Sequence, residues 1–210
     1  MLSSLAQSRQ QPCQLTPQGL IDYVRWKKLP EVTKQKLISY YETKYRGKYF
    51  EEESLLADMN DSLRSEIVHQ NTRELIEKVP FLSRSANDGR DDIFFRRIAG
   101  FLHARYFIPG DFITKQGEYG KDMFFILSGK VHVYVNGKRA VALYDGAYIG
   151  EVALICRAMR TATVEAAMPS VLYRLTLEDF QSVLIEFPDM KAKIDKLAKD
   201  RERMLSVYNQ

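Results

Sequence analysis

The segment from Tyr106 to Gly146 constrains the fold most, because short runs of β-branched and aromatic residues alternate there with glycine-bearing turns. The runs are about four to six residues long and the turns recur about every eight to twelve positions, which is typical of an antiparallel all-β unit, either a barrel or a roll. Asn136-Gly137 between two such runs predicts a tight hairpin, since both residues tolerate positive φ in a type I′ turn.

The residues before this segment follow a helical pattern from Pro17 to about Val79. Thr16 is expected to be the N-cap of the first helix, with Pro17 at the first helical position. Apolar residues then recur at spacings of three and four: Leu20, Tyr23 and Val24, then Leu37, Ile38, Tyr41 and Tyr45, then Leu63, Ile67, Leu75 and Ile76. The helices are short and their apolar faces wide, so we expect burial against a partner subunit or the rest of the chain.

The predicted fold class is therefore α+β, a helical region followed by an antiparallel, jelly-roll-like β-roll that helices flank. Residues 1–16, rich in Gln and Ser, are expected to be a disordered or vector-derived lead-in. Residues 17–80 form the helical region and residues 81–207 the second unit. Within that unit we expect a helix at 91–103, the β-roll at about 104–175, and closing helices at about 176–207 that begin at Thr176 and Pro188.

Composition excludes several classes of protein. The net charge of +4 is modest, since 31 basic residues are nearly matched by 27 acidic ones, whereas nucleic-acid binding favours a concentrated basic face. The dense basic pattern from Lys191 to Arg203 alternates with Asp195, Asp200 and Glu202, as on a solvated helix face. No uncharged apolar run approaches the roughly 20 residues that span a bilayer. Two cysteines, Cys13 and Cys156, do not make a disulfide framework, which favours a reducing, cytosolic compartment.

The histidines give no sign of catalysis. His69, His103 and His132 fall in separate predicted elements, without a nucleophile or a metal-ligand spacing. We therefore predict no catalytic residues, no metal site and no cofactor, and a chain that is not an enzyme.

The segment from Tyr148 to Val164 is the candidate binding site. It lies between two predicted strands and carries small residues at Gly150 and Ala153, a short helical turn from Glu151, and the pair Arg160-Thr161. A phosphate could lie against the N–H groups of the turn, with Arg160 supplying charge and Thr161 a hydroxyl. The alternative is a simple connection in which Arg160 and Glu151 pair across the loop.

This segment is similar to the phosphate-binding cassette of the cyclic-nucleotide-binding domain family, and the Pro109-Gly110-Asp111 turn, Gly117 and Gly120 match upstream. The resemblance implies that Arg160 pairs with the cyclic phosphate, that Thr161 adds a hydrogen bond, and that Glu151 accepts from the ribose 2′-hydroxyl. It also implies ligand contacts at Gly150, Val152, Ala153, Ala162, Val133, Val141 and Leu143, and on the last helix at Arg201 and Leu205, which close over the purine.

The segments Tyr23–Pro30, Tyr40–Lys48 and Glu51–Leu56 resemble the C-linker of hyperpolarisation-activated cyclic-nucleotide-gated (HCN) channels. The resemblance implies a homo- or hetero-tetramer formed through the linker below a pore that is not in this sequence. Two departures concern affinity: Ile149 stands where many relatives have Phe, and Met204 where HCN relatives carry a basic residue. No acidic residue stands at Met204 or Leu205 to meet a guanine edge, which favours cAMP, although Thr161 permits cGMP.

The resulting expectation is the ligand-sensing region of a cyclic-nucleotide-regulated cation channel on the cytoplasmic side of the cell membrane. It binds cAMP, or possibly cGMP, and couples binding to gating through the linker. The alternative is a stand-alone cyclic-nucleotide-binding module of a non-channel protein, because such a domain serves several kinds of regulator. No contact with nucleic acid is expected, and contact with the membrane only through the missing pore.

Overall fold

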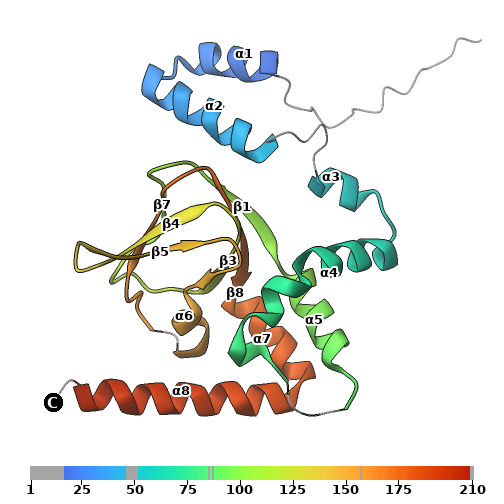
Figure 1. The fold of residues 1–210 in the computed structure, drawn as a ribbon. Coiled ribbons are helices and arrows are strands. Elements are labelled where there is room, and N and C mark those ends of the chain that lie inside the picture. Colours follow the sequence, from blue (N-terminus) through green and yellow to red (C-terminus); the bar gives the residue numbers. More distant parts are fainter. Residues whose placement is uncertain (1–16, 46–51, 85, 87, 157, 209–210) are drawn as a thin grey trace, which may run out of the picture.

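A computed structural model describes residues 17–45, 52–84, 86, 88–156 and 158–208 (Figure 1), and side chains of α8 only as far as residue 200. Four helices and a 3-10 turn come first: α1 (Pro17–Lys27), α2 (Glu31–Tyr45), α3 (Glu52–Ala57), α4 (Asp61–Glu77) and η1 (Pro80–Leu82). Helix α5 (Asp91–Gly100) follows and leads into the β-roll. Asn60 caps α4 by accepting a hydrogen bond from the Leu63 N–H at 2.9 Å. The predicted N-cap Thr16 and the lead-in lie outside the described residues.

The predicted β-roll is confirmed as two antiparallel sheets of four strands each. One sheet has the order β1-β8-β3-β6 and the other the order β2-β7-β4-β5. The strands are β1 (His103–Phe107), β2 (Phe112–Thr114), β3 (Asp122–Ser128), β4 (Lys130–Val135), β5 (Lys138–Tyr144), β6 (Tyr148–Ile149), β7 (Thr163–Ala166) and β8 (Ser170–Thr176). Helix α6 (Glu151–Cys156) interrupts the roll between β6 and β7, and α7 (Leu177–Glu186) and α8 (Pro188–Tyr208) follow it.

The hairpin between β4 and β5 forms as its sequence predicts. Asn136 has a φ of 50° and Gly137 a φ of 76°, the left-handed values that a type I′ turn requires. Val133 pairs with Val141 across this hairpin, and Val131 pairs with Leu143. Val133, Val141 and Leu143 line the same cavity as Gly150 and Glu151 at the start of α6.

Two hydrophobic clusters hold the molecule together. The smaller one lies between the sheets and includes Phe124, Ile126 and Val164. The larger one joins Leu75, Ile76 and Val79, at the end of the linker helices, to residues of α5, α7 and the first turns of α8. Ile76 and Phe94 are both fully buried, so α4 and η1 pack as part of the same core as the β-roll's flanking helices.

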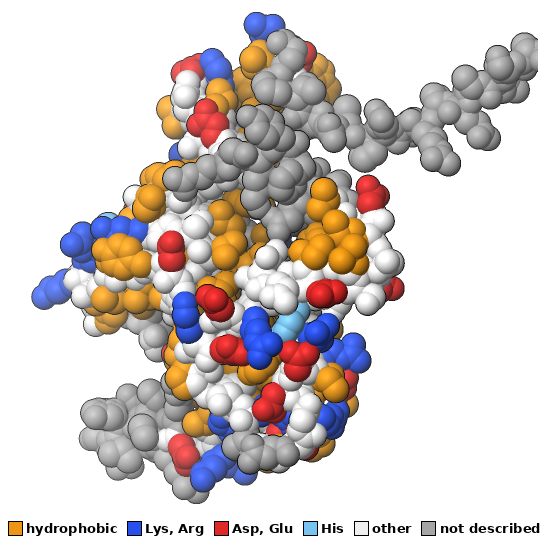
Figure 2. Space-filling view, turned by 45° about the vertical axis from the view of Figure 1, so that its right-hand side comes forward, with side chains coloured by type: hydrophobic (Ala, Val, Ile, Leu, Met, Phe, Trp, Pro, Cys, Tyr) orange, Lys and Arg blue, Asp and Glu red, His pale blue; other side chains and the backbone are white. Residues whose placement is uncertain are grey.

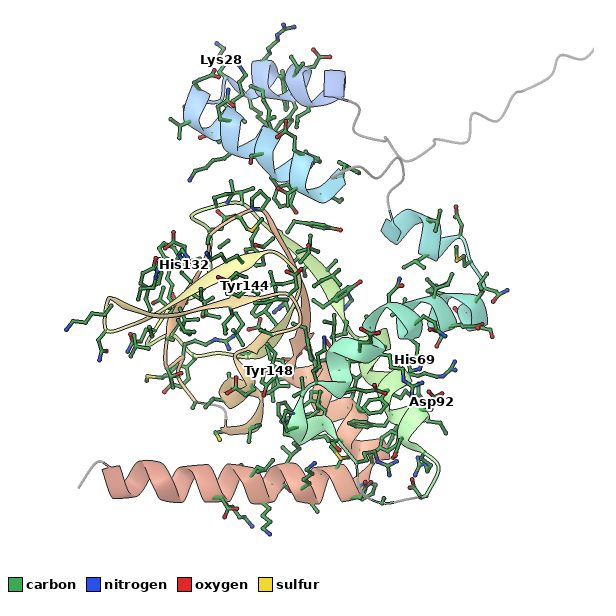
Figure 3. The ribbon with its side chains drawn as sticks, viewed as in Figure 1. Lys28, His69, Asp92, His132, Tyr144 and Tyr148 are labelled. Carbon is green, nitrogen blue, oxygen red and sulfur yellow. The ribbon has the colours of Figure 1, made fainter. Side chains whose placement is uncertain are left out.

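A buried histidine lies at the junction between the linker and the roll. His69 on α4 is only 2% exposed, and its Nε2 lies 3.0 Å from a carboxylate oxygen of Asp92 on α5 (Figure 3). Asp92 also accepts a hydrogen bond from Arg96 at 2.8 Å, which lowers the pKa of this carboxyl. The contact between α4 and α5 is therefore polar at its edge and apolar at its centre.

The first helix of the second unit is shorter than predicted. Helix α5 ends at Gly100, three residues before His103, because the Phe101 N–H turns back to the Ile98 and Ala99 carbonyls and closes the last turn. His103 instead starts β1 and pairs with Arg174 of β8. Helical periodicity does not show where the helix ends and the strand begins, because an apolar residue such as Leu102 suits a helix and a strand alike.

The hairpin of α1 and α2 lies on the far side of the roll from α8 (Figure 1). Leu20 and Val24 are buried, whereas Trp26 is 74% and Val32 71% exposed. Tyr40 of α2 packs edge-on against Tyr106 of β1, with ring centroids 6.3 Å apart. The hairpin therefore contacts the roll through α2 and leaves large apolar side chains uncovered.

The surface carries charges of both signs. Figure 2 shows acidic and basic side chains intermixed on the face that it presents, without a patch of one sign. Among the described residues, no helix combines the length and the apolar character that a membrane crossing requires.

Candidate ligand-binding site

A cavity of about 220 Å³ opens between β4, β5 and the β6–α6 connection. Ten of the twelve residues predicted to bind the ligand line it: Val133, Val141, Leu143, Gly150, Glu151, Val152, Ala153, Arg160, Thr161 and Ala162. The sheet contributes an apolar wall, and the loop after α6 contributes the charge. The structure thus brings residues from two separate parts of the sequence to one site.

Arg160 is the buried cation of this cavity, with only 8% of its side chain exposed. Its Nη1 donates to the Gly150 carbonyl at 3.3 Å. Gly150 has a φ of 82°, and a Cβ on it would overlap Nη1 of the arginine. A Cβ on Gly120 would lie 2.5 Å from Nε of the same side chain. A side chain at either position would displace the guanidinium of Arg160, and at Gly150 the positive φ also favours glycine.

Asp122 at the start of β3 is the anion that Arg160 meets. Nη2 of Arg160 donates to one carboxylate oxygen of Asp122, and Nε of Arg174 donates to the other at 2.7 Å. The Asp122 side chain is 17% exposed. Two guanidinium groups share one carboxylate, so the group as a whole carries a net charge of +1. It can still attract a phosphate, and the aspartate fixes where the arginine points.

Backbone hydrogen bonds fix the loop that carries Arg160. Its N–H donates to the Glu118 carbonyl at 2.8 Å, and its carbonyl accepts from the Gly117 N–H at 2.9 Å. The neighbouring Gln116 N–H donates to the Thr163 hydroxyl at 2.9 Å. The loop between β2 and β3 therefore holds the loop after α6 from one side, and this explains the role of the predicted Gly117–Gly120 turn.

Several residues of the site escape a reading of the sequence alone. Asp122 and Arg174 lie 38 and 14 positions from Arg160, and only the pairing of β3 with β8 brings them together. Tyr148 and Met159 also line the cavity (Figure 3 labels Tyr148 beside α6). The predicted contacts from the last helix, Arg201 and Leu205, lie outside the residues whose side chains are described.

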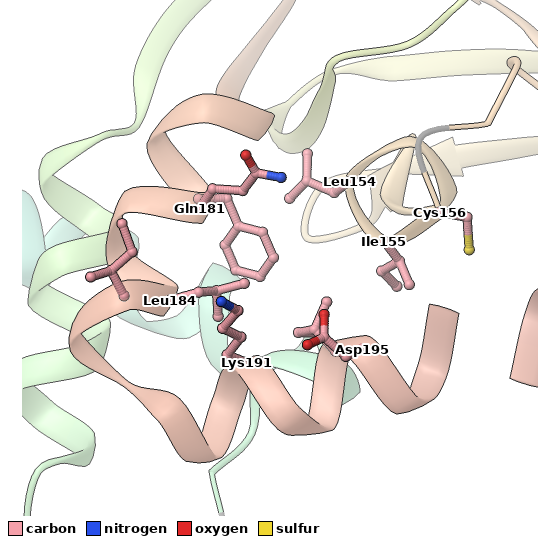
Figure 4. A pocket seen from close by; sticks show the side chains of 10 residues that line it. Leu154, Ile155, Cys156, Gln181, Leu184, Lys191 and Asp195 are labelled. Atoms are coloured by element: carbon pink, nitrogen blue, oxygen red, sulfur yellow. The ribbon is translucent and has the colours of Figure 1, made fainter. Parts of the chain in front are cut away.

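A second cavity of about 500 Å³ lies between α6, α7 and α8 (Figure 4). Its floor is apolar, with Leu154, Phe180 and Leu184, and Lys191 and Asp195 stand at its edge on α8. Helix α8 also contacts α6, and its Ile194, Leu197 and Ala198 pack against the larger hydrophobic cluster.

Comparison with known proteins identifies the class. Residues 104–187 match the family model of the cyclic nucleotide-binding domain. The match covers all eight strands except the first residue of β1, together with α6 and α7. It therefore contains the whole candidate site apart from the last helix.

Similarity to channel proteins extends over nearly the whole chain. The potassium/sodium hyperpolarization-activated cyclic nucleotide-gated channel 4 of Oryctolagus cuniculus is 37% identical over 201 residues, 96% of this chain and 17% of that protein. Channel 3 of Mus musculus is 35% identical over 209 residues, 100% of this chain and 26% of that protein. Channel 2 of Mus musculus is 37% identical over 201 residues, 96% of this chain and 23% of that protein.

The chain therefore belongs to the HCN-type family and comprises its C-linker and cyclic nucleotide-binding domain. It spans only about a sixth to a quarter of the length of these relatives, 17% to 26%. The relatives are ion channels, and the prediction that the chain is not an enzyme is confirmed.

Proposed function

We propose that this chain is the cytoplasmic ligand-sensing region of a cyclic-nucleotide-regulated cation channel, that it binds cAMP in preference to cGMP, and that the linker passes binding to the pore. One observation carries the proposal: a buried arginine, packed against Gly120 and Gly150, faces a cavity that ten of the predicted ligand residues line. Such a preorganised cation suits a compact dianionic or monoanionic phosphate group.

The cavity suggests how the ligand lies. Its volume of about 220 Å³ is below the roughly 300 Å³ at which pockets for drug-sized ligands begin, so it suits the sugar and phosphate better than the whole nucleotide. The phosphate then meets Arg160 and Thr161, and Glu151 accepts from the ribose. The purine extends along β5, where Val141 is 48% exposed and gains an apolar neighbour.

Calorimetric titration with cAMP and with cGMP tests the proposal. Arg160→Gln removes the cation, and we expect binding to weaken by at least about thirtyfold, since leaving a buried charge without its partner costs roughly 2–5 kcal/mol. Arg139→Gln, on the exposed β4–β5 hairpin, is the matched control and should bind as the unmodified chain does. Absence of binding by the unmodified chain, or equal binding by the two variants, would sink the proposal.

The linker supports assembly into a tetramer. Within the described part of the chain, Trp26 of α1 and Val32 of α2 stay 74% and 71% exposed, and exposed apolar faces usually meet another subunit. Sedimentation at increasing protein concentration tests this, with Trp26→Glu expected to lower the association constant. Ile185→Glu, on the 76% exposed side chain of α7, is the control outside the linker. If both variants associate like the unmodified chain, the α1–α2 face is not the interface.

A further inference from the structure

The β4–β5 hairpin carries the apolar wall of the ligand cavity, and strand pairing holds only its base. Strand β5 is at the edge of its sheet, where β4 is its neighbour in the part of the chain that the structure describes. Strand β4 pairs with β7 as far as Tyr134, which lies opposite Thr163, the first residue of β7. The turn at Asn136 and Gly137 therefore extends beyond the last pair between β4 and β7.

A glutamine side chain supplies a second hold at this turn. Nε2 of Gln116, two residues after β2, donates to Oδ1 of Asn136 at 2.8 Å, and its Oε1 accepts from the backbone N–H of Asn136 at 2.8 Å. Val135 and Lys138 form the last cross-strand pair of the hairpin, so the Asn136 N–H lies outside the ladder. Gln116 therefore satisfies a backbone donor and a side-chain acceptor of one turn residue together.

The segment that contains Gln116 also holds the loop that carries Arg160. The backbone N–H of Gln116 donates to the Thr163 hydroxyl at 2.9 Å, and the next two residues bond the carbonyl and the N–H of Arg160 at 2.9 and 2.8 Å. Two positions before Gln116, the buried Thr114 donates its hydroxyl to the Ala162 carbonyl at 3.3 Å. One short segment thus holds the Arg160 loop through its backbone and the hairpin through the Gln116 side chain.

We propose that Gln116 is a positioning residue for ligand binding: its side chain holds the β4–β5 hairpin against the segment that fixes the Arg160 loop, so that the apolar wall and the cation face the ligand together. This inference rests on the proposed function for the ligand. Gln116 and Asn136 are exposed and stand outside the set of residues that line the cavity, so they act through the two walls. Walls that are already aligned reduce the ordering cost of binding.

Amide hydrogen exchange of the whole chain, measured by NMR without ligand, tests the hold. Gln116→Ala removes both hydrogen bonds to Asn136, and we expect exchange at the Asn136 amide to become about twofold to tenfold faster, the range for a neutral hydrogen bond. Gln116→Glu keeps an acceptor for this N–H, and the Asn136 side-chain amide can turn to donate to the carboxylate, so exchange should stay within about twofold of the unmodified chain. Gln35→Ala removes an exposed glutamine that donates to Glu31 on α2 and is the matched control. Equal exchange at Asn136 in Gln116→Ala and in this control overturns the hold.

Calorimetric titration with cAMP tests the positioning, at about 0.15 M salt so that exposed charges are largely screened. We expect Gln116→Ala to bind about threefold to tenfold more weakly, and Gln116→Glu and Gln35→Ala to bind within about twofold of the unmodified chain. Rescue by glutamate separates positioning from the mere removal of a side chain. Unchanged binding by Gln116→Ala, or binding by Gln116→Glu as weak as that of Gln116→Ala, overturns the role. Absence of binding by the unmodified chain instead refutes the proposed function, and exchange at Asn136 still decides whether Gln116 holds the hairpin.

Discussion

Replacing Gly150 by alanine tests the geometry of the phosphate site directly. The residue has a φ of 82°, and its new Cβ would overlap Nη1 of Arg160 and lie 3.0 Å from the Asp122 carbonyl oxygen. The left-handed backbone costs about 1–2 kcal/mol for a residue with a Cβ. Moving Nη1 away from the Gly150 carbonyl costs about a further 1.5–3 kcal/mol, the worth of a hydrogen bond to a charged group.

The expected result is a loss of about 2–5 kcal/mol in the free energy of unfolding and at least tenfold weaker cAMP binding, since each 1.4 kcal/mol at the phosphate is about tenfold in affinity. Urea unfolding and calorimetric titration measure the two effects. Gly137→Ala is the matched control, because its φ of 76° imposes the same backbone strain and its Cβ meets no atom within 4 Å. It should lose only the strain energy and keep its affinity. Equal affinities of the two variants would refute the claim that Arg160 needs the space of Gly150.

Three other substitutions test the surroundings of the site. Asp122→Asn raises the local charge from +1 to +2, and the added charge attraction near a surface, roughly 1 kcal/mol, should tighten cAMP binding about fivefold. Calorimetric titration measures this change. Weaker binding would mean that the carboxylate acts mainly by orienting Arg160. Hydrogen bonds from Arg84 lower the pKa of Asp88 to about 2, so its contribution to stability is complete above about pH 4 and disappears as the pH falls towards 2. Urea unfolding across this range should therefore show a shallower pH dependence for Asp88→Asn, and an unchanged slope would contradict the pairing. Leu82→Ala removes a fully buried side chain of the shared core and should cost about 2–5 kcal/mol in the same assay; a loss below about 1 kcal/mol would contradict its packing.

The grouping of the candidate site residues could be predicted from the sequence because these residues are local. Gly150, Glu151, Arg160 and Thr161 lie within one turn and loop whose resemblance to a phosphate-binding cassette predicted one site, and all four line one cavity in the structure. Ligand binding there stays a prediction. The partner of Arg160 was not predictable in this way. The sequence offered Glu151 as an alternative partner, whereas the structure supplies Asp122. Backbone hydrogen bonds of Arg160 with Gly117 and Glu118 hold its loop against the loop that leads into Asp122. A contact between two loops of this kind leaves no trace in the spacing of residues along the chain.

The same limit explains the cluster that Arg84 forms with Asp88, Asp91 and Asp189. Arg84 and Asp189 are 105 positions apart; Arg84 lies in a short polar stretch, whereas Asp189 stands between Pro188 and Met190, and neither sequence context indicates the other as a partner. Only packing of α8 against η1 buries the arginine and gives these charges a structural role. Buried ion pairs of this kind become visible when the tertiary fold excludes water from them.

The linker shows why a helical pattern predicts burial better than it predicts the partner. All of its helices carry apolar positions at three- and four-residue spacing, and the pattern left open whether a subunit or the rest of the chain would cover them. The rest of the chain covers helix α4, since Ile76 and Val79, just after the helix, are fully buried against the helices that flank the roll. The α1–α2 hairpin is covered only in part, since Leu20 and Val24 are buried whereas Trp26 and Val32 stay exposed. The linker is therefore part of the same core as the β-roll's flanking helices at its α4 end, and it presents uncovered apolar side chains at its α1–α2 end.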